Sequence, residues 1–364
     1  MDTRADDRLL TGAGARIVGL DVARGLAIIG MFAAHVAPRA DEAELFVDGR
    51  SSILFATLAG IALGVMTGQS RPTPRGSRAD RLLGIGARAV ILFVLGVTLA
   101  GLSSGVAIIL DYYAIMFLLM IPVLFLKRWM LAVIAVMLVG LAPLLGAGQR
   151  DVNYDAGPVA LVVDYYLLNG FYPVLIWLPF LVAGLISARS NLSRPLTQLL
   201  MMVLGLFFAV AGYGAALLVP GISAEAHSGS TAEVLGSGGF AIAVIGGLLW
   251  ATAPERGRPG RITRAVLTPV AAAGAMALTL YTLQILALAA LVAADENGTD
   301  QGLLAWDYPG WPLLIGLSVA SVVFAMLWRR LLGKGPLERV LALVTQPRRR
   351  RDRKPSAVRP RRPE

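Results

Sequence analysis

Residues 20–37 read LDVARGLAIIGMFAAHVA, an apolar stretch that carries three ionisable side chains, Asp21, Arg24 and His35. In an α-helix each residue advances about 100° and about 1.5 Å, so Arg24 and His35 fall within roughly 20° of each other and about 16 Å apart along the axis. Asp21 lies about 40° from His35 on the same face. Because polar groups are costly in the hydrocarbon of a bilayer, such a stripe on a membrane-spanning helix indicates a functional role.

The composition of the chain predicts that this helix spans a membrane. Of the 364 residues, 56% are hydrophobic and only 15% are charged, and the mean hydropathy is +0.69. Apolar runs of about 17 to 25 residues, the length that crosses a bilayer as a helix, recur along the sequence. We therefore predict an all-α, polytopic integral membrane protein with about ten transmembrane helices. These are expected at residues 17–38, 51–69, 82–103, 106–126, 129–147, 170–188, 197–219, 236–253, 265–293 and 311–331.

The distribution of basic residues predicts how these helices are oriented. If the amino terminus is inside, only Arg39, Arg50 and Arg150 of the 33 lysines and arginines fall on the outer side. Basic loops face the cytoplasm, so both termini are predicted to be cytoplasmic and the membrane to be the plasma (inner) membrane. The net charge of +10 is thus explained by topology, and no nucleic-acid partner is expected.

The hydropathy pattern predicts one membrane domain at residues 17–331. A cytoplasmic amino tail is expected at 1–16 and a basic cytoplasmic tail at 332–364, disordered from about residue 346 because RRRRDRKPSAVRPRR (348–362) is a proline-rich charge block. PVALVVDYYLL (158–168) is apolar but too short to span, which favours a re-entrant or interfacial segment.

The absence of cysteine limits the possible chemistry. It removes disulfides, thiolate nucleophiles and cysteine metal sites. With only His35 and His227 available, a histidine-rich metal site is not expected either.

Arg24 and Asp21 are candidate ligand-binding residues at the cytoplasmic end of the first span. Arg24 lies about two turns into this helix, where it can snorkel to the interface and be neutralised by Asp21, a purely structural role. Alternatively, its planar guanidinium binds a phosphate or phosphoanhydride that arrives from the cytoplasm. The residues alone leave both roles open.

His35 lies near the outer end of the same helix and is the only histidine in a predicted span. It is either a hydrogen-bonded structural residue or a general base, the role for which histidine is best suited near neutral pH. Asp111, in the first turns of the predicted helix 106–126, is expected at the same depth. It either orients His35 or caps its own helix.

Two polar residues of the ninth predicted span, Tyr281 and Gln284, are candidate substrate-binding residues. Gln284 needs a hydrogen-bond partner in hydrocarbon, which predicts that it lines an internal cavity.

Four residues on the outer side complete the candidate site. Gly49, Arg50 and Ser51, at the outer start of the second span, offer hydrogen-bonding groups for a sugar or a developing oxyanion. His227, in the polar loop between the seventh and eighth spans, is either solvated or part of the site.

Several segments resemble a known family. Arg24 and His35, with ten residues between them and preceded by LDVARG, resemble the Arg-x10-His motif on the first helix of transmembrane acyltransferases. RIVGLDVARGLAIIGMFAAHV and GRSSILFATLAGIALG are similar to the heparan-alpha-glucosaminide N-acetyltransferase catalytic-domain superfamily and its bacterial YeiB-like relatives. FYPVLIWLPFLVAGLI, GAMALTLYTLQ and GPLER, in the carboxyl half, are similar to segments of YeiB-like proteins.

This resemblance implies a reaction in which an acyl group, commonly acetyl, passes from cytoplasmic acyl-coenzyme A to a hydroxyl or amine of an extracytoplasmic acceptor. It implies that Arg24 contacts the donor and that His35 is the catalytic histidine, without a metal. Transfer is then either direct or through an acyl-histidine.

A transporter or flippase that uses the same intramembrane polar residues is the rival hypothesis. A structural or assembly protein of the membrane would leave the intramembrane charges unexplained. Expected partners are the lipid bilayer, acyl-coenzyme A and the extracytoplasmic acceptor. The oligomeric state, with a homodimer as one option, is left open.

Overall fold

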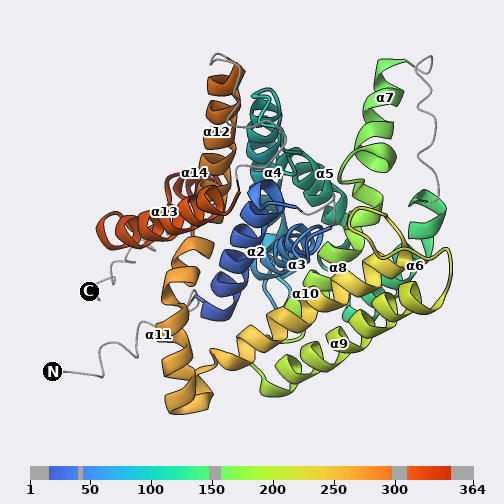
Figure 1. The fold of residues 1–364 in the computed structure, drawn as a ribbon. Coiled ribbons are helices and arrows are strands. Elements are labelled where there is room, and N and C mark those ends of the chain that lie inside the picture. The colour runs from blue at the N-terminus through green and yellow to red at the C-terminus, as the bar shows by residue number, and fades with distance from the viewer. Residues whose placement is uncertain (1–15, 40–43, 147–156, 297–309, 346–364) are drawn as a thin grey trace, which may run out of the picture.

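A computed structural model describes residues 16–39, 44–146, 157–296 and 310–345, and in these ranges the chain is helical without a strand (Figure 1). Its elements, in chain order, are α2 (Val18–Val36), α3 (Arg50–Met66), η1 (Arg75–Ser77), α4 (Arg78–Ala100), α5 (Leu110–Met120), η2 (Ile121–Val123), α6 (Arg128–Gly146), α7 (Pro158–Asp164), η4 (Tyr165–Asn169), α8 (Val174–Arg189), α9 (Pro195–Leu218), α10 (Thr231–Ala251), η5 (Pro254–Arg256), α11 (Gly257–Gly274), α12 (Ala277–Glu296), α13 (Gly310–Leu331) and α14 (Pro336–Thr345). The amino tail before Arg16 and the basic stretch after Thr345, for which tails were predicted, lie outside the described residues.

The all-helical, membrane-spanning character predicted from the sequence is confirmed. The described part of the chain contains six helices that are long and apolar enough to cross a membrane, or seven if residues 158–169 and 174–189, which bend by 52° at a short break, form one span. Arg50–Met66, Leu110–Val123 and Arg128–Leu141 are apolar but shorter. The count of ten spans and the orientation of the termini stay predictions.

The ninth span was predicted wrongly as one helix over 265–293. The structure divides it into α11 and α12, which are separated by a turn at Ala275 and Met276. The N–H of Met276 donates to the carbonyl of Ala273, 2.9 Å away, instead of to a residue four positions earlier, so the regular helical pattern ends there. Hydropathy cannot reveal such a break, because the residues on both sides of it are apolar.

Helix α2 lies in the middle of the bundle, against α3, α10, α11 and α13 (Figure 1). Its contact with α11 is backbone to backbone, because a Cβ atom at Gly274 would collide with the carbonyl oxygen of Asp21 and the nitrogen of Gly25. Small residues that allow such close approach are typical of helix pairs in membranes. The break after α11 therefore packs against the part of α2 around Asp21 and Gly25, the half that is predicted to face the cytoplasm.

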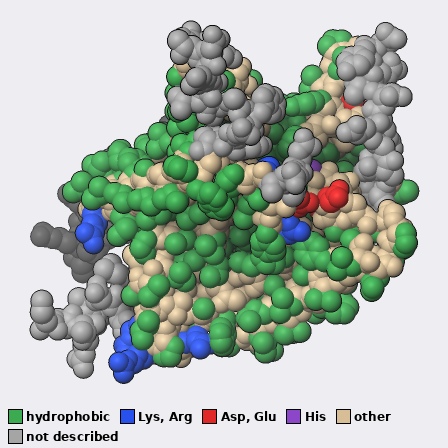
Figure 2. All heavy atoms as spheres, viewed as in Figure 1, with side chains coloured by type: hydrophobic (Ala, Val, Ile, Leu, Met, Phe, Trp, Pro, Cys, Tyr) green, Lys and Arg blue, Asp and Glu red, His purple; other side chains and the backbone are tan. Residues whose placement is uncertain are grey.

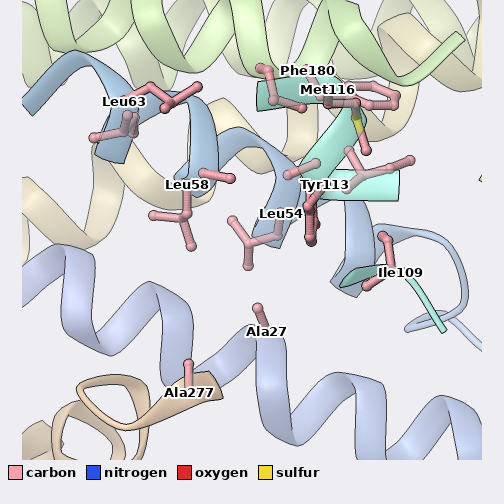
Figure 3. Packing of buried hydrophobic residues seen from close by; sticks show 14 of the residues in the cluster. Ala27, Leu54, Leu58, Leu63, Ile109, Tyr113, Met116, Phe180 and Ala277 are labelled. Carbon is pink, nitrogen blue, oxygen red and sulfur yellow. The ribbon is translucent and has the colours of Figure 1, made fainter. Parts of the chain in front are cut away.

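Helix α3 forms the next layer of the core. Figure 3 shows Leu54 and Leu58 of α3 between Ala27 of α2 and Phe180 of α8, with all four side chains in the buried cluster. Much of the face drawn in Figure 2 is also hydrophobic, while Lys and Arg gather where α11 begins. An apolar exterior agrees with contact to lipid, where exposed hydrophobic side chains carry no cost. Examples with more than half of the residue exposed are Val90, Val136, Met137, Phe207, Val210 and Leu217.

Helix α14 was not predicted, because its sequence lies in the segment expected to be a tail. It packs against α4 and α12, and Leu341 is 3% exposed while Leu343 is 78% exposed. This amphipathic pattern explains why a short helix docks here. The described end of the chain is thus part of the folded protein.

Candidate functional site

A cavity of about 480 Å³ opens between α2, α3, α4, α5, α12 and α14. Its wall is mostly apolar, with residues such as Phe55, Leu58, Leu92 and Phe117. Its charged lining residues are Arg16, Asp21, Arg24, Arg88 and Glu338. Three cations beside an apolar wall suit a molecule that has an anionic end and an apolar or extended remainder.

Asp21 and Arg24 line this cavity together. Arg24 Nη1 donates to Asp21 Oδ1 over 2.9 Å, the contact expected three residues apart on a helix. Arg16 Nε lies 3.6 Å from the other carboxylate oxygen. The side chain of Asp21 is 9% exposed and that of Arg24 is 27% exposed. The ion pair holds the guanidinium at the cavity while leaving part of it accessible.

Arg88 is a cavity residue that the sequence analysis missed. The residue is partly buried, its buried Nε has no partner, and no hydrogen bond or ion pair joins it to the described residues. An unpaired buried cation is costly, so a site of this kind calls for an anion. The available signal was the position of Arg88 inside the predicted apolar span 82–103.

His35 and Gln284 are brought together from α2 and α12. The amide nitrogen of Gln284 lies 2.9 Å from His35 Nδ1, and Gln284 is 2% exposed. The prediction that Gln284 needs a partner is confirmed, but its partner is the histidine, and neither residue is among those that line the cavity. This pair therefore lies apart from the arginines, further along α2.

The proposed pairing of His35 with Asp111 is not what the structure contains. Asp111, which is 5% exposed, accepts a hydrogen bond from the Tyr166 hydroxyl over 2.9 Å, and its other carboxylate oxygen has no partner in the described chain. Tyr166 belongs to η4, so Asp111 contacts the segment predicted to be re-entrant. The partner of Asp111 is thus set by how segments distant in sequence pack together. The expected depth of Asp111 in the membrane could not predict it.

Tyr281 joins two helices, and its contact with a substrate stays a prediction. Its hydroxyl accepts a hydrogen bond from the backbone N–H of Ile109, 3.4 Å away, and the residue is 3% exposed. It lies one turn before Gln284 on α12 and joins that helix to the start of α5.

The three candidate residues at the start of α3 differ in their surroundings. Gly49 has φ +62 and immediately precedes the helix, and Ser51 is 8% exposed. Arg50 donates from Nε to the Tyr213 hydroxyl over 2.8 Å and from Nη1 to Glu44 over 3.1 Å. These contacts engage the guanidinium in joining α3 to α9. Arg39 and Asp48 form another ion pair at 2.6 Å, shortly after the end of α2, which the sequence did not predict.

His227 contacts a cluster of aromatic rings, and the residue is also exposed to solvent. Its ring centroid lies 4.5 Å from that of Phe171, 5.5 Å from that of Tyr172 and 6.0 Å from that of Trp177. Its backbone N–H donates to buried Glu233 over 2.7 Å. Desolvation by the neighbouring groups lowers the pKa of the His227 imidazole from 6.5 to about 4. The ring is therefore neutral at physiological pH.

No group of three or more histidine, cysteine or acidic residues that could hold a metal occurs in the described ranges. Comparison with known families finds that residues 183–347 match a family model described as a protein of unknown function (DUF418), a YeiB-like family. The matched segment contains Gln284 and Glu338 but neither Arg24 nor His35. None of the curated proteins matches the chain.

Proposed function

We propose that the protein is a membrane acyltransferase. It passes an acyl group, in the simplest case acetyl, from cytoplasmic acyl-coenzyme A to a hydroxyl or amine of an extracytoplasmic glycan, lipid or envelope metabolite. The observation that carries the proposal is the arginine-lined cavity at one end of α2, the helix whose other end holds His35.

At the arginine end, the donor is held by charge. Arg24 lines the cavity and is partly accessible, so its two parallel N–H groups can donate to a pair of phosphate oxygens. The apolar wall accommodates the uncharged arm of the donor, whereas the nucleotide phosphates stay with the arginines. This arrangement explains why a polar residue is placed at each end of one span.

At the histidine end, His35 is the general base. The acceptor O–H or N–H gives its proton to the ring nitrogen as its oxygen or nitrogen bonds to the acyl carbon. The carbon–sulfur bond breaks and the thiolate leaves, and the proton held by the imidazolium passes to the thiolate through water, which restores the neutral base. No covalent enzyme intermediate is needed.

The contact with Gln284 sets which ring nitrogen can act. If the amide N–H donates to Nδ1, the ring proton is on Nε2, which then cannot accept another. Rotating the amide by a half-turn presents its oxygen to Nδ1–H and frees the Nε2 lone pair. The base function requires this second arrangement, so Gln284 is a positioning residue in the proposed reaction.

The proposed topology follows the basic residues. Both termini face the cytoplasm, the membrane is the plasma membrane, and the arginine cavity opens inward. Arg16, at the start of α2, and α14 with its following basic segment then share that side, which agrees with the rule that basic residues stay inside.

The rival function is transport or flipping of an anionic amphiphile. The 52° break between residues 158–169 and 174–189 favours this rival, since interrupted spans line the binding sites of many transporters. Uptake of a labelled solute into sealed vesicles without any acyl donor would support it.

The test of acyl transfer uses purified protein in nanodiscs with acetyl-coenzyme A and an envelope extract. We expect His35→Ala to abolish transfer while donor binding stays within about twofold of wild type, because the base does not hold the donor. Arg24→Gln should weaken donor binding by about tenfold or more. Failure of the wild-type protein to bind coenzyme A at millimolar concentration would overturn the proposal.

A further inference from the structure

The turn between α11 and α12 places the start of α12 beside the cavity. Ala275, Ala277 and Leu278 all line the cavity at this break. The N-terminus of a helix carries partial positive charge and unpaired N–H donors, so it attracts anions. Interrupted helices in membranes use such ends to bind anionic groups of their substrates.

In the structure this end of α12 is occupied by a carboxylate from another helix. Glu338 of α14 accepts a hydrogen bond from the Thr279 N–H over 3.1 Å at one oxygen and from the Thr279 hydroxyl over 2.6 Å at the other. The Leu337 N–H also donates to the Thr279 hydroxyl, 3.3 Å away. Thus α14 is attached to the first turn of α12 through the Glu338 carboxylate and the Leu337 N–H.

Arg88 gives an independent reason to expect an anion here. It lines the same cavity and lies within electrostatic range of both Arg24 and Glu338, yet it forms no ion pair within the described residues. Glu338 is bonded to Thr279 instead and does not come within ion-pair distance of Arg88. The cavity therefore contains excess positive charge that its own carboxylates do not fully neutralise.

We propose that the first turn of α12 and Arg88 bind the phosphate end of a ligand that carries an apolar or extended tail. We further propose that Glu338 occupies this anion site until the ligand displaces it together with α14. If the proposed function is right, this ligand is the acyl donor, and in that respect the inference rests on it. The phosphate chemistry is shared by a soluble phosphoester and by a lipid headgroup, and the experiment distinguishes these two sources.

The first measurement is the affinity of the full chain for coenzyme A in nanodiscs of zwitterionic lipid. Arg88→Gln should weaken binding by about tenfold or more, because a charge-assisted contact to phosphate is lost. Arg88→Lys should recover part of the loss. Glu338→Gln should strengthen binding by about threefold or more, since the competing negative charge is removed. The matched controls are Arg81→Gln on α4 and Arg339→Gln on α14, both exposed and outside the cavity, and they should bind as wild type does.

The second arm replaces coenzyme A with phosphatidic acid in the nanodisc. If phosphatidic acid binds in an Arg88-dependent way and coenzyme A does not bind, the site stands but the acyl-donor function fails. If coenzyme A binds equally to wild type and to Arg88→Gln, the donor function stands and this site is wrong. If neither probe binds, both are wrong.

The displacement of α14 is tested by thiol reactivity, which is clean because the chain has no cysteine. Leu341 is buried in the cavity wall and Leu343 is exposed on the same helix. A Leu341→Cys variant should react slowly with a charged maleimide and at least about fivefold faster with the bound probe or with Glu338→Gln added. The Leu343→Cys variant should react fast throughout. Equal rates for Leu341→Cys with and without probe would overturn the displacement of α14.

Discussion

Gln284 and His35 are separated by 249 positions in the sequence, and yet the amide nitrogen of Gln284 lies 2.9 Å from Nδ1 of His35. The contact joins α12 to α2, on the α12 side of the break that separates α11 from α12. It gives the buried glutamine a partner and fixes the orientation of the imidazole. The most direct consequences concern the tautomer of His35.

Replacing Gln284 should therefore affect turnover more than donor binding. We expect Gln284→Leu to lower kcat by about tenfold or more while KM for acetyl-coenzyme A changes little, because Nδ1 loses its partner but the arginines are untouched. Gln284→Glu, whose carboxylate accepts from Nδ1–H, should retain more activity than Gln284→Leu. Leu283→Ala, at an exposed neighbouring position on α12, is the control and should keep the wild-type kcat. Wild-type kcat in Gln284→Leu would contradict the positioning role.

The close contact between α2 and α11 predicts a steric effect at Gly274. A methyl group there collides with the Asp21 carbonyl and the Gly25 nitrogen, so Gly274→Ala should destabilise the fold by roughly 1–3 kcal/mol. Gly86→Ala is the matched control, because a Cβ at that helical position meets nothing within 4 Å. The control should be neutral or stabilising by up to about 1 kcal/mol. Thermal unfolding in detergent measures both, and equal midpoints would show that the helices can separate at no cost.

The lowered pKa of His227, which lies in the loop between α9 and α10, predicts that the stability of the protein depends on pH. The pKa of His227 is about 4 in the folded protein and 6.5 as a reference, so between these values the unfolded chain binds a proton that the folded chain does not. Its contribution to the free energy of unfolding is therefore constant above about pH 6.5 and falls as the pH drops towards 4. We expect His227→Asn, which does not titrate and tolerates the observed φ of +62, to show a smaller loss of unfolding midpoint between pH 7.5 and 5 than wild type. An unchanged slope would mean that His227 titrates normally in the folded state.

Local patterns in the sequence predicted local features of the structure. The all-helical membrane character followed from apolar runs, and the Asp21–Arg24 contact follows from their spacing on one helix. Contacts between helices could not be predicted in the same way. Depth alone suggested Asp111 as the partner of His35, whereas the packing of α12 and η4 provides Gln284 for the histidine and Tyr166 for the aspartate.

The cavity shows the same limit. Arg88 follows several arginines near the start of a span, and Glu338 lies in a segment that reads as a tail, so neither is conspicuous in the sequence. The break at Ala275 and Met276 is hidden because hydropathy is continuous across it. All three features meet at one cavity only after folding, since α4, α12 and α14 are distant in sequence.

The central claim is that an acyl group crosses the membrane along a path that begins at the arginines and ends at His35. It is tested most directly by supplying radiolabelled acetyl-coenzyme A to the cytoplasmic face alone of sealed vesicles that contain the protein and trap envelope extract on the opposite side. The account predicts that labelled acetyl appears on the trapped acceptor while coenzyme A stays outside the vesicles, and that His35→Ala abolishes the transfer. Absence of label from the trapped acceptor with wild-type protein, or equal transfer by His35→Ala, would contradict it.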